Sequence, residues 1–286
     1  MSGLLMAEEI ESKIVALKQE AKEVRKDDLT MIAKALSGHP GGSLSLVEIL
    51  VSLFYGGVLR HDPKNPSFPD RDRLILSKGH GCPALYVMLA HRGYFPREAL
   101  WTLRKLGSPL QGHPHRGLPG IESSSGSLGQ GLSIATGIAL AARLDQKSYR
   151  TYCILGDGEM DEGQIWESAM TAAHYSVDSL CAILDANGVQ QNGPVKTIKN
   201  LEPIPDKWRS FGWHTIEVNG HRFAELLTAF EEAKNTKGKP TMIVARTVKG
   251  KGVSFMEGQS VWHGKAPNPE QLEQALKEIE AGDIGS

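Results

Sequence analysis

Short apolar runs alternate with segments of helical periodicity along most of this chain. The apolar runs have the length of buried strands, and they lie at 73–76, 152–155, 180–184, 215–218 and 241–245. Apolar residues recur at helical spacing at about 4–36, 83–91, 96–106, 165–173, 223–233 and 268–279. Strands that alternate with helices indicate a parallel sheet covered by helices on both faces. We therefore predict an α/β fold.

Length, charge and cysteine content limit the possible size of the fold, the partners and the location. The 286 residues can bury the core of one large domain or of two small ones. The formal net charge of −1 gives no indication of a nucleic acid or an anionic membrane as partner. Three cysteines without CxxC spacing, and the absence of a membrane-spanning run or a secretory leader, lead us to expect a cytoplasmic protein.

Polar loops follow two of the predicted strands, which are separated by one helix. Asp157 stands between Gly156 and Gly158 after the first strand, and Asn187 follows the second. The carboxyl ends of adjacent parallel strands lie side by side, so these oxygens are expected at one edge of the sheet. With the Val189 carbonyl they suit Mg²⁺ or Ca²⁺, and the glycines and the next helix N-terminus suit an anion. Each loop alone could be an ordinary turn.

Three further loops carry histidines. His39 lies in Gly-His-Pro-Gly-Gly, which we expect to be a loop, and Ser45 and Glu48 after it form a sequence pattern typical of a helix capping box. His80 stands at a glycine-flanked turn between a strand and a helix. The His113-Pro-His115 segment has the spacing of some zinc ligands, but no second pair of ligands lies nearby. Each loop also has a plain interpretation as a surface turn.

Two other patterns bear on phosphate binding. The glycines from Gly126 to Gly131 read GxxGxG and follow a polar segment, which argues against the dinucleotide-binding fingerprint. They open a helix rich in small residues. Lys249 and Lys251 lie in a Gly-rich segment after the last predicted strand, and they suit a phosphate clamp or a solvated loop about equally.

The segments GDGEMDEG and LDANGVQQNG resemble the thiamine-diphosphate motif of the transketolase family, and the resemblance extends over nearly the whole chain. It implies one diphosphate-binding domain over residues 1–286, with an N-terminal helix at about 4–36 and a C-terminal loop and helix at about 250–286. It implies thiamine diphosphate and Mg²⁺ as cofactors, with Ca²⁺ or Mn²⁺ as substitutes. Asp157, Asn187 and Val189 would hold the metal.

The resemblance also implies roles for other residues. His39, His80, His113 and His263 match catalytic histidines of the family, and His80 and His263 also lie near its cofactor. The remaining implied cofactor-binding residues are Gly126, Leu128, Gly156, Asp157, Gly158, Asn187 and Glu162, the last reaching across a dimer interface. The chain departs from the family pattern at Ser127, which replaces a proline, and at His115, which replaces a glutamate.

Transketolases carry their activating glutamate, pyrimidine pocket and phosphate-binding arginines in a second domain. We therefore expect a subunit that transfers a two-carbon ketol unit between sugar phosphates only with a separate C-terminal subunit, as an α₂β₂ heterotetramer. Three alternatives stay open: an enzyme of this type for a branched or sulfonated ketose, the α subunit of a 2-oxo-acid dehydrogenase E1 component, and an inactive scaffold.

Overall fold

A parallel five-stranded sheet forms the centre of the computed structural model, which describes residues 2–282, with side chains from residue 10 onward. The strand order is β1-β2-β3-β7-β6. The strands are β1 Arg73–Leu76, β2 Thr151–Gly156, β3 Leu180–Ala186, β6 His214–Asn219 and β7 Thr241–Arg246. A two-residue hairpin pairs β4 Val189–Gln190 with β5 Gly193–Pro194. All five predicted strands are confirmed, each within two residues of its expected ends.

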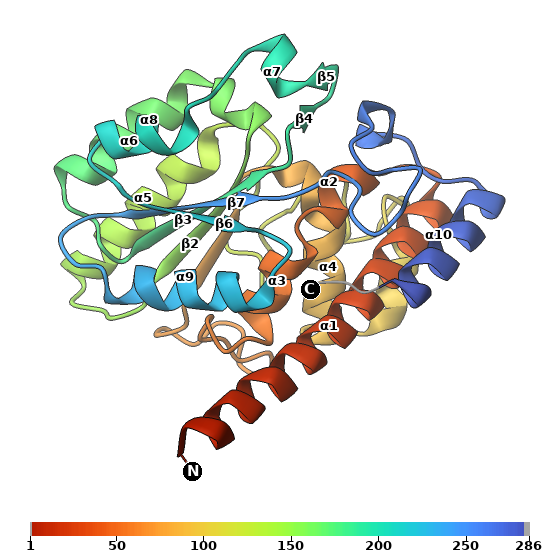
Figure 1. Cartoon of the computed structure of the whole chain (residues 1–286), viewed down its shortest axis with the longest axis horizontal. Coiled ribbons are helices and arrows are strands. Elements are labelled where there is room, and N and C mark those ends of the chain that lie inside the picture. Colours follow the sequence, from red (N-terminus) through yellow and green to blue (C-terminus); the bar gives the residue numbers. More distant parts are fainter. Residues whose placement is uncertain (1, 283–286) are drawn as a thin grey trace.

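Helices cover both faces of the sheet, as predicted (Figure 1). The α-helices are α1 Ser2–Ala35, α2 Pro40–Leu44, α3 Val47–Phe54, α4 Cys82–His91, α5 Gln130–Leu144, α6 Gly163–His174, α7 Val195–Ile198, α8 Ile204–Ser210, α9 Phe223–Asn235 and α10 Pro269–Ala281. Short 3₁₀ helices are η1 Gly79–Gly81, η2 Arg97–Thr102, η3 Gly158–Asp161 and η4 Ser260–His263. No helix in residues 2–282 combines the length and apolar character needed to cross a membrane.

Alternate residues of each inner strand enter two separate hydrophobic clusters. In β2, Tyr152 and Ile154 pack with α3, α4 and α9, whereas Cys153 and Leu155 pack with α5, α6 and α8. Side chains of a strand point alternately to the two faces of the sheet, so this run must be apolar throughout. The sheet is therefore buried on both sides, and a ligand has access to it only at its edges or ends.

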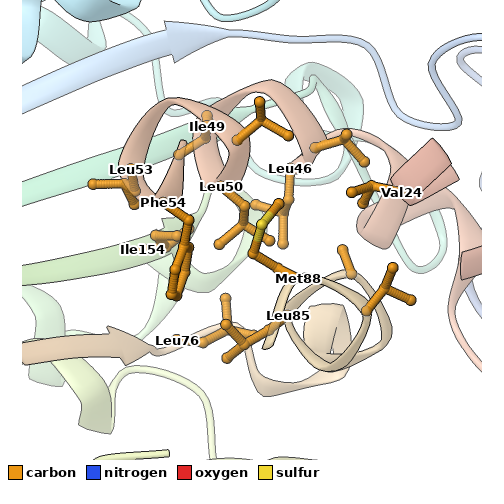
Figure 2. Packing of buried hydrophobic residues seen from close by; sticks show 14 of the residues in the cluster. Val24, Leu46, Ile49, Leu50, Leu53, Phe54, Leu76, Leu85, Met88 and Ile154 are labelled. Atoms are coloured by element: carbon orange, nitrogen blue, oxygen red, sulfur yellow. The ribbon is translucent and has the colours of Figure 1, made fainter. Parts of the chain in front are cut away.

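The larger cluster holds the histidine-bearing loops against the sheet. Every residue of α3 is buried, and Leu50 packs near Met88 and Leu85 of α4 (Figure 2). Truncating one such buried leucine costs about 2–5 kcal/mol. Because α2 and η1 lead directly into α3 and α4, this packing fixes where the chain places His39 and His80.

The local structure around α2 differs from the prediction in two ways. Residues Pro40–Leu44 form a short helix where a loop was expected, and a proline at the first helical position favours that start. The capping box does not form, because Leu46 is the N-cap and no side chain caps α3. Ser45 donates instead to Asp185, and Glu48 pairs with Arg25. Buried charged groups need partners more than a helix end needs a cap.

Candidate active site

A cavity of about 280 Å³ opens at the carboxyl ends of the central strands. The predicted site residues come from six separate loops, and all but one of them line it. They are His39, His80, His113, Gly126, Leu128, Gly156, Asp157, Gly158, Asn187, Val189 and His263. Lys78, Glu159, Gln190, Gln191 and Lys249 complete the lining. The sequence had left Lys249 open between a phosphate clamp and a solvated loop, and the other four were not identified as site residues. The tertiary structure thus brings the separate motifs into one site.

The predicted metal ligands lie together on one side of the cavity. Asp157 accepts hydrogen bonds from the backbone N–H groups of Gly158 and Gly188, at 2.8 and 2.5 Å. The Asn187 side-chain carbonyl accepts from the N–H of Val189 at 3.1 Å, which turns the loop back on itself. Each of these oxygens keeps a further lone pair for a cation. The set of carboxylate, amide and backbone oxygens fits a hard divalent cation.

Lys249 already places a positive charge at this side of the cavity. Its Nζ lies 2.9 Å from the Val189 carbonyl oxygen and 2.9 Å from Nδ1 of His263. Lys249 is 2% exposed, so the solvated-loop interpretation does not hold for this lysine. Burial and the charge of Lys78 lower the pKa of Lys249 to about 8. The Val189 carbonyl oxygen that accepts from this ammonium group is also one of the oxygens predicted to bind a metal.

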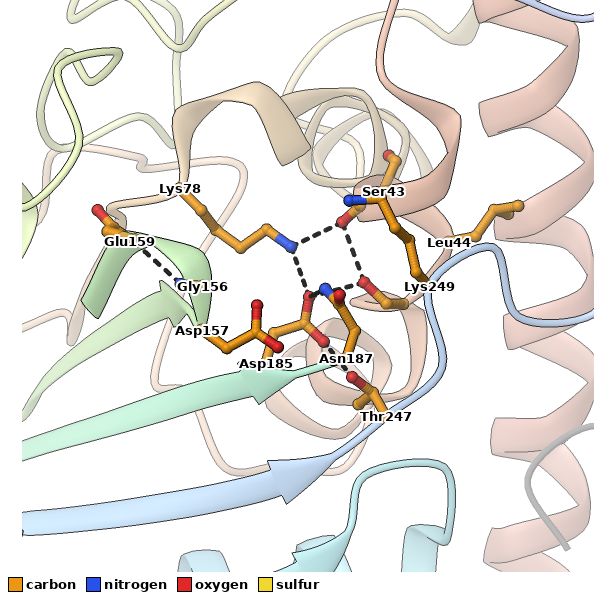
Figure 3. A network of polar contacts seen from close by, with 12 residues as sticks. Ser43, Leu44, Lys78, Gly156, Asp157, Glu159, Asp185, Asn187, Thr247 and Lys249 are labelled. Atoms are coloured by element: carbon orange, nitrogen blue, oxygen red, sulfur yellow. Dashed lines mark hydrogen bonds and ion pairs between the residues drawn. The ribbon is translucent and has the colours of Figure 1, made fainter. Parts of the chain in front are cut away.

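Beneath the cavity, Asp185 organises a buried polar network (Figure 3). This fully buried carboxylate receives hydrogen bonds from four side chains: Ser45, Lys78, Asn187 and Thr247. Burial alone would raise the pKa of Asp185, but the charge of Lys78 and these hydrogen bonds hold it below its usual range. The network joins α2, β1, β3 and β7, and it fixes the Asn187 amide so that its oxygen is available to a ligand.

A second buried carboxylate ties the glycine-rich loops together. Glu159 accepts from the hydroxyl of Ser77 and from the backbone N–H groups of Gly129 and Gly156, at 2.5, 2.9 and 3.0 Å. Burial raises the pKa of Glu159, and these three hydrogen bonds oppose that rise. Glu159 therefore holds the loop before α5 against the Asp157 turn.

Burial raises the pKa of Asp157 to about 6, and the charge of nearby Asp185 acts in the same direction. The two carboxylates repel each other, and their burial limits the screening of this repulsion by solvent. A positive charge beside Asp157 would relieve that repulsion. This is a second reason, besides the donor set, that the site suits a cation.

The histidines form a ring at the mouth of the cavity. The ring centroid of His39 lies 5.4 Å from those of His80 and His263 and 6.3 Å from that of His113. Burial, followed by nearby Arg104, lowers the pKa of His39 to about 4, and burial with Lys249 lowers that of His263 to about 3. The pKa of His80 is also well below its usual value, again chiefly through burial.

The lowered pKa values favour the neutral imidazole at pH 7 for His39, His80 and His263. Burial and the surrounding cationic side chains disfavour a positive charge on each of these rings. Each ring therefore offers one N–H donor and one acceptor to a ligand, which suits the binding and orientation of hydroxyl and phosphate oxygens.

The loop before α5 also takes part in the cavity. Gly126 has φ +157°, and a Cβ there would lie 3.5 Å from the ring of His113. Gly129, at φ +83°, packs against the side chain of Glu162. Glu162 itself is exposed at the start of α6 and does not line the cavity, so the structure separates it from the other predicted cofactor ligands.

The metal-ligand interpretation of His113 and His115 gains no support. Residues 10–282 contain no group of three or more His, Cys, Asp or Glu side chains placed to hold a metal. His113 lines the cavity, whereas His115 does not. The candidate cation site depends instead on one carboxylate, an amide and a backbone carbonyl.

The buried charged residues were missed for a common reason. Lys78 and Asp185 lie next to the recognised motifs, but charged residues at strand ends are usually solvated, and their pairing joins positions far apart in sequence. One available signal was the position of Asp185 at the end of an apolar run, where a charged residue that is buried needs a partner.

Comparisons with known proteins agree with this geometry. The family profile described as "Transketolase, thiamine diphosphate binding domain" matches residues 17–280. The chain is 47% identical over 267 residues to the 6-deoxy-6-sulfo-D-fructose transketolase subunit SqwG of Clostridium sp., covering 93% of this chain and 97% of that protein. It is 40% identical to one subunit of the apulose-4-phosphate transketolase of Phocaeicola vulgatus, covering 93% and 95%.

This chain matches only part of the length of longer transketolases. Human transketolase is 40% identical over 270 residues, which cover 94% of this chain and 43% of that protein. The crystal structure of transketolase from Campylobacter jejuni superposes with a TM-score of 0.88 at 35% identity, covering 92% of this chain and 42% of that one. The chain therefore belongs to the transketolase family, as an N-terminal subunit that carries the thiamine-diphosphate-binding domain.

Proposed function

We propose that the cavity binds thiamine diphosphate together with a divalent cation, and that the chain transfers a two-carbon ketol unit from a ketose to an aldose with a separate C-terminal subunit. The observation that carries the proposal is the convergence of Asp157, Asn187 and the Val189 carbonyl at the histidine-lined cavity. Mg²⁺ is the metal we expect, because its preferred ligands are oxygens of this kind.

Thiamine diphosphate, when bound, supplies the carbanion chemistry by which a carbon–carbon bond beside a carbonyl is broken and remade. The residues of this chain bind the cofactor and hold it in position. Lys78, Lys249 and the backbone N–H groups near Gly158 offer positive charge to a diphosphate, and the neutral rings of His39 and His263 offer hydrogen bonds to oxygens in the cavity.

The open side of the cavity is where we place the partner subunit. In our proposal the partner supplies the activating carboxylate and the pocket for the pyrimidine, and the assembly is an α₂β₂ heterotetramer. The naming of the two full-length relatives as transketolase subunits supports a two-chain enzyme. The exposed position of Glu162 is consistent with the contact across subunits that the family resemblance implies.

The substrate class has two candidates. Sugar phosphates are the first, in line with apulose-4-phosphate in the name of one relative. A sulfonated ketose is the second, and the higher identity of 47% to the sulfofructose enzyme subunit favours it. Phosphate and sulfonate groups are similar in shape, and most of their recognition is expected in the partner. The 2-oxo-acid dehydrogenase alternative is not supported, because the matching family is transketolase.

Isolation of the native complex tests the proposal. The tagged chain is isolated from its native cell, and the eluate is analysed by intact mass and by a ketol-transfer assay. We expect a second chain in equal amount, with activity that needs both thiamine diphosphate and Mg²⁺. Activity of the pure chain alone would overturn the two-chain proposal. A complex that binds cofactor and metal but turns over no ketose would favour the scaffold alternative.

A substrate panel then separates the two candidates. The assembled enzyme is given a phosphorylated and a sulfonated ketose of equal chain length, with the same aldose acceptor. A kcat/KM at least tenfold higher for one of them, about 1.4 kcal/mol in transition-state binding, assigns the class.

A further inference from the structure

Arg104 lies behind the four histidines that line the cavity, between the loop that carries His39 and the loop that carries His113. It follows η2 in the left-handed backbone region, with φ +58°, which is uncommon for a residue other than glycine. Its backbone N–H donates to the carbonyl of Leu110 at 2.8 Å. This hydrogen bond closes a turn and directs the side chain toward the loop that carries His39.

The guanidinium group contacts both neighbouring loops. Nη1 donates to the hydroxyl of Ser37 at 2.8 Å, and Nη2 lies 3.4 Å from Nδ1 of His39. On its other side it packs against Gly112, where a Cβ would lie 2.8 Å from Nη2. Gly112 immediately precedes His113. Arg104 thus fills the space between the His39 loop and the His113 loop, and the missing side chain at position 112 makes room for it.

This contact determines where the proton of His39 resides. A guanidinium group only donates hydrogen bonds, so the ring nitrogen that faces it must be the acceptor. His39 is neutral at pH 7, because burial and the charge of Arg104 lower its pKa to about 4. A neutral imidazole carries one N–H, which must then be at Nε2. Within the described part of the chain, Nε2 has no hydrogen-bond partner, and the ring lines the cavity.

We propose that Arg104 is a positioning residue that holds His39 with its proton on Nε2, so that an N–H donor faces the cavity and meets an oxygen of the bound ketose. Gly112 is part of this arrangement, since any larger residue would displace the guanidinium. The binding of a ketose rests on the proposed function, whereas the position of the proton does not.

The first test reads the proton position directly. The full chain is labelled with ¹⁵N-histidine, and long-range ¹H–¹⁵N correlations distinguish protonated from bare ring nitrogens at pH 7. The His39 signals are those missing from His39→Gln. We expect a bare Nδ1 and a protonated Nε2 in the wild type, and a mixture of the two tautomers in Arg104→Gln.

Gly112→Ala is the second variant, because it displaces the guanidinium while the arginine and its charge remain. It should give the same mixture, and it keeps the test valid if Arg104→Gln folds poorly. A protonated Nδ1 in the wild type, or an unchanged tautomer in both variants, would overturn the proposal.

The second test measures turnover in the complex with the partner subunit. Arg104→Gln and Gly112→Ala should lower kcat/KM by roughly tenfold, as expected for the loss of one hydrogen bond. Arg209→Gln, at an exposed arginine of α8 paired with Asp206, is the matched control and should leave turnover unchanged. Normal turnover in variants whose tautomer has changed would refute the positioning role. If no ketose is turned over by the wild type, the proposed function fails, while the tautomer result still stands by itself.

Discussion

Two fully buried ion pairs of this chain are alike in chemistry and differ in surroundings. Arg25 and Glu48 are enclosed in the core, where Arg25 also donates to the Lys251 carbonyl and Glu48 accepts from His221. Lys78 and Asp185 lie beneath the cavity, and Lys78 forms part of its lining. Protein groups supply the partners of both pairs, except at Nη1 of Arg25, and only the second pair borders a cavity that a ligand can enter.

The difference shows two uses of the same interaction. The enclosed pair joins α1 to α3 and to the loop before α9, so its removal should affect folding most. The pair beneath the cavity orients Asn187 and places charge near the proposed diphosphate site. Substitutions near this pair should therefore affect cofactor affinity most.

The largest effect is expected from Arg25→Met. It leaves the Glu48 carboxylate buried with only His221 as a close partner, and removing one partner of a buried pair costs about 3–5 kcal/mol in the free energy of unfolding. Urea unfolding of the full chain measures it. Arg222→Met, at an exposed pair with Glu225, is the control and should cost less than about 1 kcal/mol. Equal losses in the two variants would contradict the comparison.

The second-largest effect is expected from acid, which should weaken the enclosed pair of Arg25 and Glu48. Burial would raise the pKa of Glu48, but the charge of Arg25 and the hydrogen bond to His221 lower it to about 2. A carboxyl group with a lowered pKa stabilises the fold fully above about pH 4.5, and this contribution is lost as the pH falls toward 2. The shift corresponds to about 3 kcal/mol.

Urea unfolding at pH 7, 5 and 3.5 checks this prediction in the wild type and in Glu48→Gln. The stability difference between the two proteins should be constant from pH 7 to 5 and smaller at pH 3.5. A difference that does not change with pH would show that Glu48 is not charged in the folded protein.

At the cavity edge, Asp157→Asn should lower the affinity for thiamine diphosphate in the presence of Mg²⁺ by about 100-fold, or about 2.7 kcal/mol. The amide keeps the shape of the side chain but removes the negative charge that faces the cation. Titration calorimetry of the assembled complex measures the affinity. The free energy of unfolding without cofactor should change by less than about 1 kcal/mol, because the charged form is disfavoured by burial. A large loss of stability with unchanged affinity would contradict the role of this side of the cavity in cofactor binding.

The smallest effect is expected far from both pairs. Asn268 caps α10 in a complete capping box with Gln271. Asn268→Ala should lower the free energy of unfolding by about 1 kcal/mol and leave cofactor affinity unchanged. A measurable change in affinity would indicate that the C-terminal helix is coupled to the cavity.

Much of the fold and of the candidate site was predictable from local pattern. Strands buried on both faces must be apolar throughout, which is why β2 and β3 were recognised with nearly correct ends. Asp157 and Asn187 were paired because parallel strands end at the same edge of a sheet. The histidine loops were identified from their glycines and from the family resemblance, and the cavity unites all four of them.

The partners of the polar residues were not predictable in this way. Ser45 and Glu48 have the spacing of a capping box, yet each has a distant buried partner, because leaving Asp185 or Arg25 without one would cost more than an uncapped helix. Lys249 was as consistent with solvent as with phosphate until its burial was known.

The sequence alone thus determined the elements and the chemistry that each loop carries, because periodicity and turn residues act over a few positions. Only the tertiary structure decided which charged and polar groups meet, and therefore which nitrogen of His39 faces the cavity. Those pairings depend on electrostatics and desolvation between residues that are far apart along the chain, as with Lys78 and Asp185.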